Sequence, residues 1–103
     1  MPEIGEWVET APGARRRVLS DAPGLMMVEF QFEAGAVGAL HNHPHIQGTY
    51  VASGRFEFTI GSETTVIGPG DSMIIPTMVT HGCVALEAGS LIDSFTPRRD
   101  DFL

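Results

Sequence analysis

Three of the four histidines of this 103-residue chain lie close together, at His41, His43 and His45. Gln47 follows two residues after the last of them, and His81 stands alone far downstream. Because successive side chains of an extended strand point to opposite faces, His41 and His43 share one face, which Gln47 can rejoin after the intervening proline bend. Two imidazoles on one face of a strand make half of a metal site. His81 is the one histidine left outside the cluster to supply a third imidazole.

The composition predicts one soluble domain. The chain is long enough for a single modest core, and its contents of 43% hydrophobic and 18% charged residues are typical of a folded protein. No apolar run approaches the roughly 20 residues that span a bilayer. The N-terminus, Met-Pro-Glu-Ile-Gly-Glu-Trp, lacks the basic and apolar regions of a signal peptide. We therefore expect a cytoplasmic protein.

The charge pattern limits the partners. A net charge of −7 disfavours binding to nucleic acid and to anionic membranes. All six basic residues are arginines, so Schiff-base chemistry by a lysine is excluded. The triplet Arg15-Arg16-Arg17 could bind an anion, but we favour a solvated strand end or a dimer contact. The lone cysteine, Cys83, lies in an apolar stretch and is interpreted as a small core residue rather than a nucleophile.

Short alternating segments recur along the chain at spacings near ten residues, with glycine and proline between them. Residues 1–24 are predicted to form an extended arm with a short strand, and residues 25–103 a single β-domain with a tail at 97–103. Strands are expected at 25–33, 49–52, 55–60, 64–67, 73–75, 80–86 and 90–95, and turns at 53–54, 61–62, 68–71 and 87–89. No helical period is present. The pattern predicts an all-β sandwich or barrel.

Two glycine-bounded segments resemble the motifs of the cupin superfamily. Gly35, His41-x-His43, Gln47 and Gly54 have the spacing of the first motif, with Gln47 where glutamate is usual. Gly70, Pro76 and His81 have that of the second, with Met78 in place of a glycine and Ala85 in place of an asparagine. The resemblance implies a single-domain jelly-roll β-barrel, which agrees with the strand count.

The resemblance also implies the metal ligands, namely His41, His43, Gln47 and His81. Three neutral imidazoles suit a divalent transition metal such as Ni, Fe, Mn, Co or Zn, and the ligand types do not choose among these. The alternative is that the histidines only satisfy polar groups in the barrel mouth. Because Gln47 adds no charge, a bound ion would keep its full +2 and attract an anionic oxygen ligand. His45 is assigned beside the site or at the surface rather than to the ligands.

The segment from His43 to Gly61 and the ending Asp-Ser-Phe-Thr-Pro-Arg-Arg-Asp-Asp-Phe-Leu resemble the KdgF-type cupins, a family of pectin degradation proteins. Members of that family speed conversion of cyclic 4,5-unsaturated uronates, released from pectin or alginate by lyases, to linear 4-deoxy-5-keto forms. The resemblance places its functional Asp, Phe and Arg at Asp93, Phe95 and Arg99. A carboxyl group suits proton transfer, and a guanidinium suits a carboxylate. Phe95 could equally be ordinary core, and Arg99 could instead pair with Asp100 or Asp101.

Three hypotheses follow. The first is a metal-dependent enzyme that opens unsaturated uronate rings, with Asp93 moving a proton and Arg99 holding the carboxylate. The second is a small iron-dependent cupin dioxygenase, and the third is a non-catalytic sugar-binding cupin. We also expect a homodimer, since cupins often pair by strand exchange.

Overall fold

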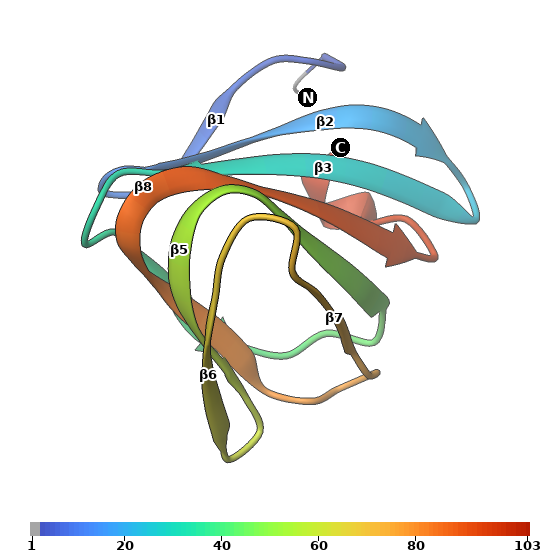
Figure 1. Cartoon of the computed structure of the whole chain (residues 1–103). Coiled ribbons are helices and arrows are strands. Elements are labelled where there is room, and N and C mark those ends of the chain that lie inside the picture. The colour runs from blue at the N-terminus through green and yellow to red at the C-terminus, as the bar shows by residue number, and fades with distance from the viewer. Residues whose placement is uncertain (1–2) are drawn as a thin grey trace.

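The computed structural model describes residues 3–103, and its elements are almost entirely β-strands (Figure 1). In chain order the elements are β1 Val8–Ala11, β2 Ala14–Ala22, β3 Leu25–Phe32, β4 Val37–His41, β5 Ile46–Ile60, β6 Glu63–Ile67, β7 Ser72–Ile75, β8 His81–Thr96 and the short 3-10 helix η1 Asp100–Phe102. The all-β prediction is confirmed.

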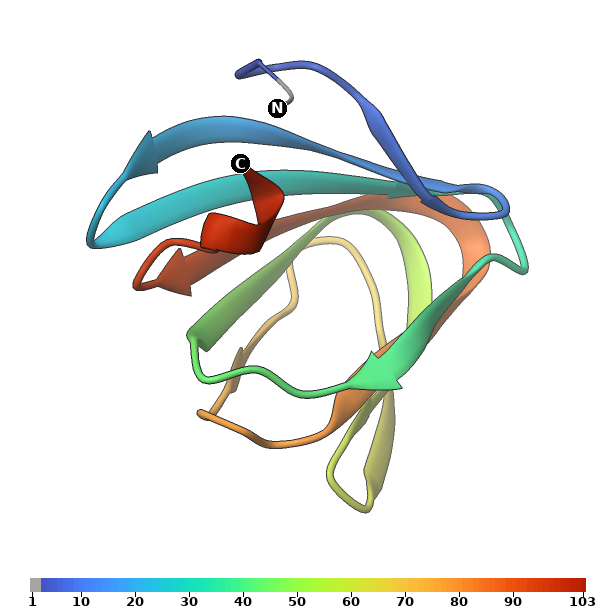
Figure 2. The same cartoon turned by 180° about the vertical axis from the view of Figure 1, so that it is seen from behind.

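The strands form one antiparallel sheet that curls into a cupin jelly roll without closing completely. Its hydrogen-bonded path runs β1-β2-β3-β8-β5-β6, while β4 pairs with β8 and β7 pairs with β5. The two long strands β5 and β8 bend around the molecule side by side (Figures 1 and 2). Each therefore takes part in both halves of the roll, and β8 contacts three different strands.

The turns predicted at 53–54 and 87–89 are wrong, because β5 and β8 continue through them. The register between the two strands shifts repeatedly between Val51 and Phe56, so the pair bends there without breaking. Gly54 adopts a φ of +82°, and a Cβ on it would lie 2.7 Å from the Ala88 carbonyl oxygen. A Cβ on Gly89 would overlap the Ser53 carbonyl oxygen. The glycines therefore mark a corner where two backbones touch, and not chain reversals.

The predicted N-terminal arm contributes β1 and β2, which are part of the sheet. β2 pairs with β3 along its length, and its Ala14 and Val18 side chains are buried. The boundary drawn at residue 24 stays a prediction.

The core has two clusters. The larger one gathers under the β5–β8 corner around Phe32, Val51 and Phe56, and the smaller one surrounds Phe95 and Phe102. Phe102 belongs to η1, which folds back beneath β2 and β3 (Figure 2). The C-terminal tail, which has no strand pattern in the sequence, thus closes one end of the roll. No helix in residues 3–103 is long and apolar enough to cross a membrane.

Candidate metal centre

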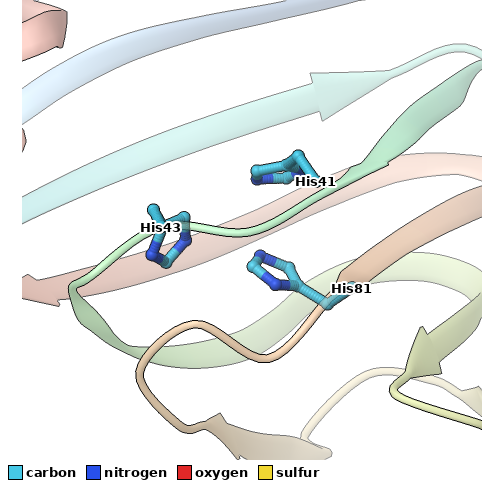
Figure 3. Close-up of side chains that lie close together, drawn as sticks. All are labelled: His41, His43 and His81. Carbon is cyan, nitrogen blue, oxygen red and sulfur yellow. The ribbon is translucent and has the colours of Figure 1, made fainter.

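The three candidate imidazoles meet although they come from separate parts of the chain. His41 ends β4, His43 lies in the loop before β5, and His81 begins β8 directly opposite His41 in the β4–β8 register. One ring nitrogen from each lies within 4.8 Å of the others, and the rings face a common point (Figure 3). The structure therefore brings together all three histidines, even though His43 lies beyond the end of the strand that carries His41.

Backbone carbonyls fix the orientation of each ring. Nδ1 lies 2.8 Å from the Ala39 oxygen in His41, 3.2 Å from the His45 oxygen in His43 and 2.9 Å from the Val79 oxygen in His81. A carbonyl only accepts, so in each neutral ring Nδ1 carries the proton and Nε2 keeps its lone pair. Nε2 of His81 is buried and has no hydrogen-bond partner. A ring whose Nδ1–H is held by a carbonyl and whose Nε2 is free has the arrangement of a metal-ligating histidine.

The side-chain oxygen of Gln47 also lacks a hydrogen-bond donor when His43 is neutral. Gln47 Nε2 donates to the Thr49 hydroxyl at 3.0 Å and to Asp93 Oδ2 at 3.2 Å, which leaves the Gln47 Oε1 pointing at His43 Nε2, 2.9 Å away. With His43 neutral, both of these atoms are acceptors. A cation next to them would satisfy both at once. The donor set thus fits a divalent ion, and its identity stays open because imidazole and amide ligands suit several transition metals.

Burial keeps two of the candidate ligands, His43 and His81, in the neutral form that a metal needs. Desolvation lowers the pKa of His81 to about 4, against which the hydrogen bond to the Val79 oxygen acts only partly. Desolvation also lowers the pKa of His43, and the contact with Gln47 opposes it. Both rings are therefore neutral at neutral pH, and protons do not compete with an ion there.

A buried carboxyl group lies beside the candidate ligand Gln47. Asp93 on β8 faces Thr49 on β5, whose hydroxyl donates to Oδ1 at 2.7 Å. Desolvation raises the pKa of Asp93 to about 7, although the hydrogen bonds from Thr49 and Gln47 and the charge of Arg99 act against it. Thr49 was not among the residues singled out from the sequence. Its position two residues after Gln47, on the same strand face, could have pointed to it.

Phe95 and Arg99 adjoin this carboxyl group. Phe95 is 1% exposed, and its ring centroid lies 5.7 Å from that of His43. The Arg99 guanidinium lies 5.1 Å from the Phe95 ring centroid, and its Nε and Nη2 donate to the two Asp101 carboxylate oxygens at 2.9 and 2.7 Å. Of the two pairings considered for Arg99, the structure has the one with Asp101, while Asp100 pairs with Arg98.

These groups border a cavity of about 390 Å³. Its polar lining comprises Thr10, Arg16, His41, Gln47, His81, Asp93, Arg99 and Asp101, and its apolar lining includes Phe30, Phe95 and Phe102. The cavity has the size of a site for a small molecule. Three of the four candidate metal ligands (His41, Gln47 and His81), a buried carboxyl group with a raised pKa and two guanidinium groups thus share one space.

Three further residues complete the picture. The ring of His45 lies beside His43 and Phe95, outside the triad. Burial raises the pKa of the Cys83 thiol to about 12, as befits a core residue. Met78 adopts a left-handed φ of 63°, at the position where the motif has glycine, and its N–H donates to the His43 carbonyl at 2.8 Å.

Comparison with known proteins agrees with this fold. The family model described as "Cupin domain" matches residues 28–93. The pectin degradation protein KdgF of Dickeya dadantii (strain 3937) is 42% identical over 99 residues, which cover 94% of this chain and 90% of that protein. The structure of KdgF from Halomonas sp. superposes with a TM-score of 0.90 at 44% identity, covering 95% of this chain and 91% of that one. An RmlC-like cupin from Shewanella frigidimarina NCIMB 400 gives a TM-score of 0.91 at 38% identity, with coverages of 95% and 88%.

The roll and its histidine cluster define a cupin. The chain belongs to the cupin family and, within it, to the KdgF-type proteins.

Proposed function

We propose that this protein is a metal-dependent enzyme that accelerates ring opening of 4,5-unsaturated uronate monosaccharides to 4-deoxy-5-keto uronates. The substrates would be products of pectin lyases, alginate lyases or both. The observation that carries the proposal is Asp93, a buried carboxyl with a pKa of about 7, placed 3.2 Å from the amide of the candidate ligand Gln47. The similarity to proteins named for pectin degradation supports the substrate class.

The reaction is an isomerisation that needs no oxidant. The C1–O5 bond of the cyclic hemiacetal breaks, the C1 hydroxyl loses its proton and C1 becomes an aldehyde. O5 is left as an enol oxygen on C5, and ketonisation then adds a proton to C4. The net change moves one proton from oxygen to carbon, which is work for a positioned acid–base group.

Each residue has a defined task in this proposal. Asp93 exchanges the proton, because a carboxyl with a pKa near 7 both accepts and donates at neutral pH. Thr49 and Gln47 hold the Asp93 carboxyl in place through their hydrogen bonds. Phe95 supplies an apolar wall, and Arg99 binds the substrate carboxylate with the N–H groups that Asp101 does not engage.

His41, His43, Gln47 and His81 would hold the divalent ion. When bound there, the ion would act as a Lewis acid on substrate oxygen atoms. An anionic, oxygen-rich sugar suits this set of neutral ligands, since they leave the charge of the ion uncompensated.

The test follows the ultraviolet absorbance of the carbon–carbon double bond in freshly prepared unsaturated galacturonate and its alginate counterpart. Spontaneous opening gives the baseline. We expect wild type to exceed it, and Asp93→Ala and Arg99→Ala to lose most of the acceleration, about 100-fold or more for the carboxyl group. Asp100→Ala and Arg55→Ala, which change exposed ion pairs, serve as controls. Absence of acceleration by metal-loaded wild type would refute the proposal, and oxygen uptake with turnover would favour the dioxygenase.

A further inference from the structure

The arginine triplet of β2 divides between the two faces of the strand. Arg15 and Arg17 lie on the outer face, where both guanidinium groups stack on the Trp7 ring and bind Gln31 and Glu29 respectively. Arg16 points the other way and lines the cavity. Its guanidinium carbon lies 3.9 Å from the centroid of the Phe102 ring.

Arg16 differs from the other arginines in its partners. Within residues 3–103 each of the other five makes a hydrogen bond or ion pair with an acidic or amide side chain, whereas Arg16 makes none. Partial burial lowers the pKa of Arg16, the charge of Asp101 opposes this, and the charge of Arg99 lowers it further. Arg16 is thus a half-buried cation that lacks a counter-ion in contact.

Of the two guanidinium groups that line the cavity, one has a carboxylate in contact and the other has none in the described part of the chain. Arg99 also stacks on the Phe102 ring, with its guanidinium carbon 4.3 Å from the centroid, but Asp101 neutralises it through two hydrogen bonds. Arg16 has no such carboxylate. Two guanidinium groups held against one ring repel each other, and an anion in the cavity would relieve that repulsion.

We propose that Arg16 is a substrate-binding residue that, together with Arg99, clamps the carboxylate of the uronate. The inference rests on the proposed function for its choice of substrate. Arg16 supplies a free guanidinium fork, which suits a planar carboxylate in a two-pronged hydrogen bond. Phe102 holds the guanidinium in place before the substrate arrives, so little rotamer freedom is lost on binding.

The test compares an acid with its neutral counterpart. Ring opening of unsaturated galacturonate and of its methyl ester is followed in wild type, Arg16→Met and Arg16→Lys, with spontaneous opening subtracted. Arg17→Met is the matched control, because Arg17 neighbours Arg16 but lies on the outer face. Because Arg16→Met removes the charged hydrogen bonds to the substrate carboxylate, we expect it to lower kcat/KM for the acid by about 10- to 100-fold, mainly through KM. The ester should be affected little, Arg16→Lys should recover part of the loss, and Arg17→Met should match wild type. An unchanged preference for acid over ester in Arg16→Met would overturn the proposal.

A binding measurement separates this inference from the proposed function. Calorimetric titration of the metal-loaded protein with galacturonate, which has the carboxylate but no double bond, does not depend on turnover. If wild type fails to open unsaturated uronates yet binds galacturonate at least 10-fold more tightly than Arg16→Met, the proposed function falls and the carboxylate site stands. Equal affinity in both proteins, or no binding by wild type, overturns the carboxylate site.

Discussion

At the residue scale, Gln47 contacts both the candidate metal ligand His43 and the buried carboxyl group of Asp93. Its oxygen faces His43 and its amide N–H groups hold Thr49 and Asp93. A glutamate at this position, which cupins commonly have, could accept a metal in the same way but could not donate to Asp93. The Gln47 amide therefore donates a hydrogen bond to the Asp93 carboxyl group and offers its oxygen to the candidate ion.

This dual contact predicts the outcome of Gln47→Glu. The new carboxylate would place a second negative charge beside Asp93 and beside the anionic substrate, so we expect metal content to persist while kcat/KM falls by about 10-fold or more. Metal analysis by emission spectrometry and the ultraviolet assay check the two parts. Gln31→Glu, on the outer face of β3, is the matched control. Wild-type activity in Gln47→Glu would contradict the role given to the amide.

The raised pKa of Asp93 predicts how the free energy of unfolding of the metal-free protein depends on pH. Its pKa of about 7 in the fold lies above the ordinary 3.8, so between these values the native state binds more protons than the unfolded state. The free energy of unfolding that Asp93 contributes therefore falls as pH rises from about 4 to 7, by up to about 1.4 kcal/mol per pH unit. His81, with its lowered pKa, acts in the opposite direction over part of this range.

The comparison with Asp93→Asn isolates the carboxyl contribution. Urea unfolding of both proteins at pH 4 to 7.5, with chelator present, should show the stability difference moving in favour of Asp93→Asn as pH rises. A difference that is constant with pH would mean that Asp93 titrates normally.

The sequence predicted the candidate site unevenly. His41, His43 and His81 were identifiable from residue type, spacing and motif, and Asp93 from the resemblance. Arg16 was noted only as part of the arginine triplet, for which we favoured a solvated strand end or a dimer contact over anion binding, because periodicity alone does not tell which face of β2 turns inward. In the structure Arg16 lines the cavity. Phe102 was missed because the tail carries no strand pattern, and its burial depends on the fold of the whole molecule.

At the element scale, the corner between β5 and β8 shapes the roll. The sequence indicated turns at its glycines, since glycine there usually marks a reversal, but the long-range pairing of two continuous strands decides the structure. The position of β3 followed from alternation, because one face of that strand, with Met26, Val28 and Phe32, is buried. Apart from the extended stretch assumed at His41 and His43, strand β4 was not among the predicted strands, since most of its side chains are exposed and it lacks a clear alternating pattern.

The corner predicts a large effect of Gly89→Ala. The added Cβ would overlap the Ser53 backbone, which cannot move without breaking the ladder, so we expect destabilisation of about 2 to 4 kcal/mol. Gly24→Ala, which has open space around it, should change stability by less than about 1 kcal/mol. Chemical denaturation measures both. Similar stability in the two variants would show that the backbone at the corner moves to accommodate the added Cβ at little cost in stability.

At the scale of the whole molecule, the candidate metal ligands link distant parts of the chain. His41, His43 and Gln47 lie on or near β4 and β5, and His81 lies on β8. An ion that binds only the folded state stabilises it by about 2.7 kcal/mol at 100 times its Kd. Metal binding should therefore stabilise the folded state by holding β4, β5 and β8 together at the site.

Differential scanning calorimetry tests this coupling. Adding Ni²⁺ or Zn²⁺ to chelator-treated protein at about 100 times Kd should raise Tm by about 10 to 20 °C. The double variant His41→Ala with His43→Ala should stay folded and show no such rise. An equal rise in that double variant would place the bound ion elsewhere.

The uninterrupted course of β8 limits how the chain can change in length during evolution. His81 opens the strand, and Asp93 and Phe95 lie near its far end. Because side chains alternate along a strand, inserting or deleting one residue between them would turn one end of the site away from the cavity. Length changes should instead accumulate at the exposed turns before β3 and β7. In related sequences, the number of residues between the positions equivalent to His81 and Asp93 would thus separate those that can assemble this site from those that cannot.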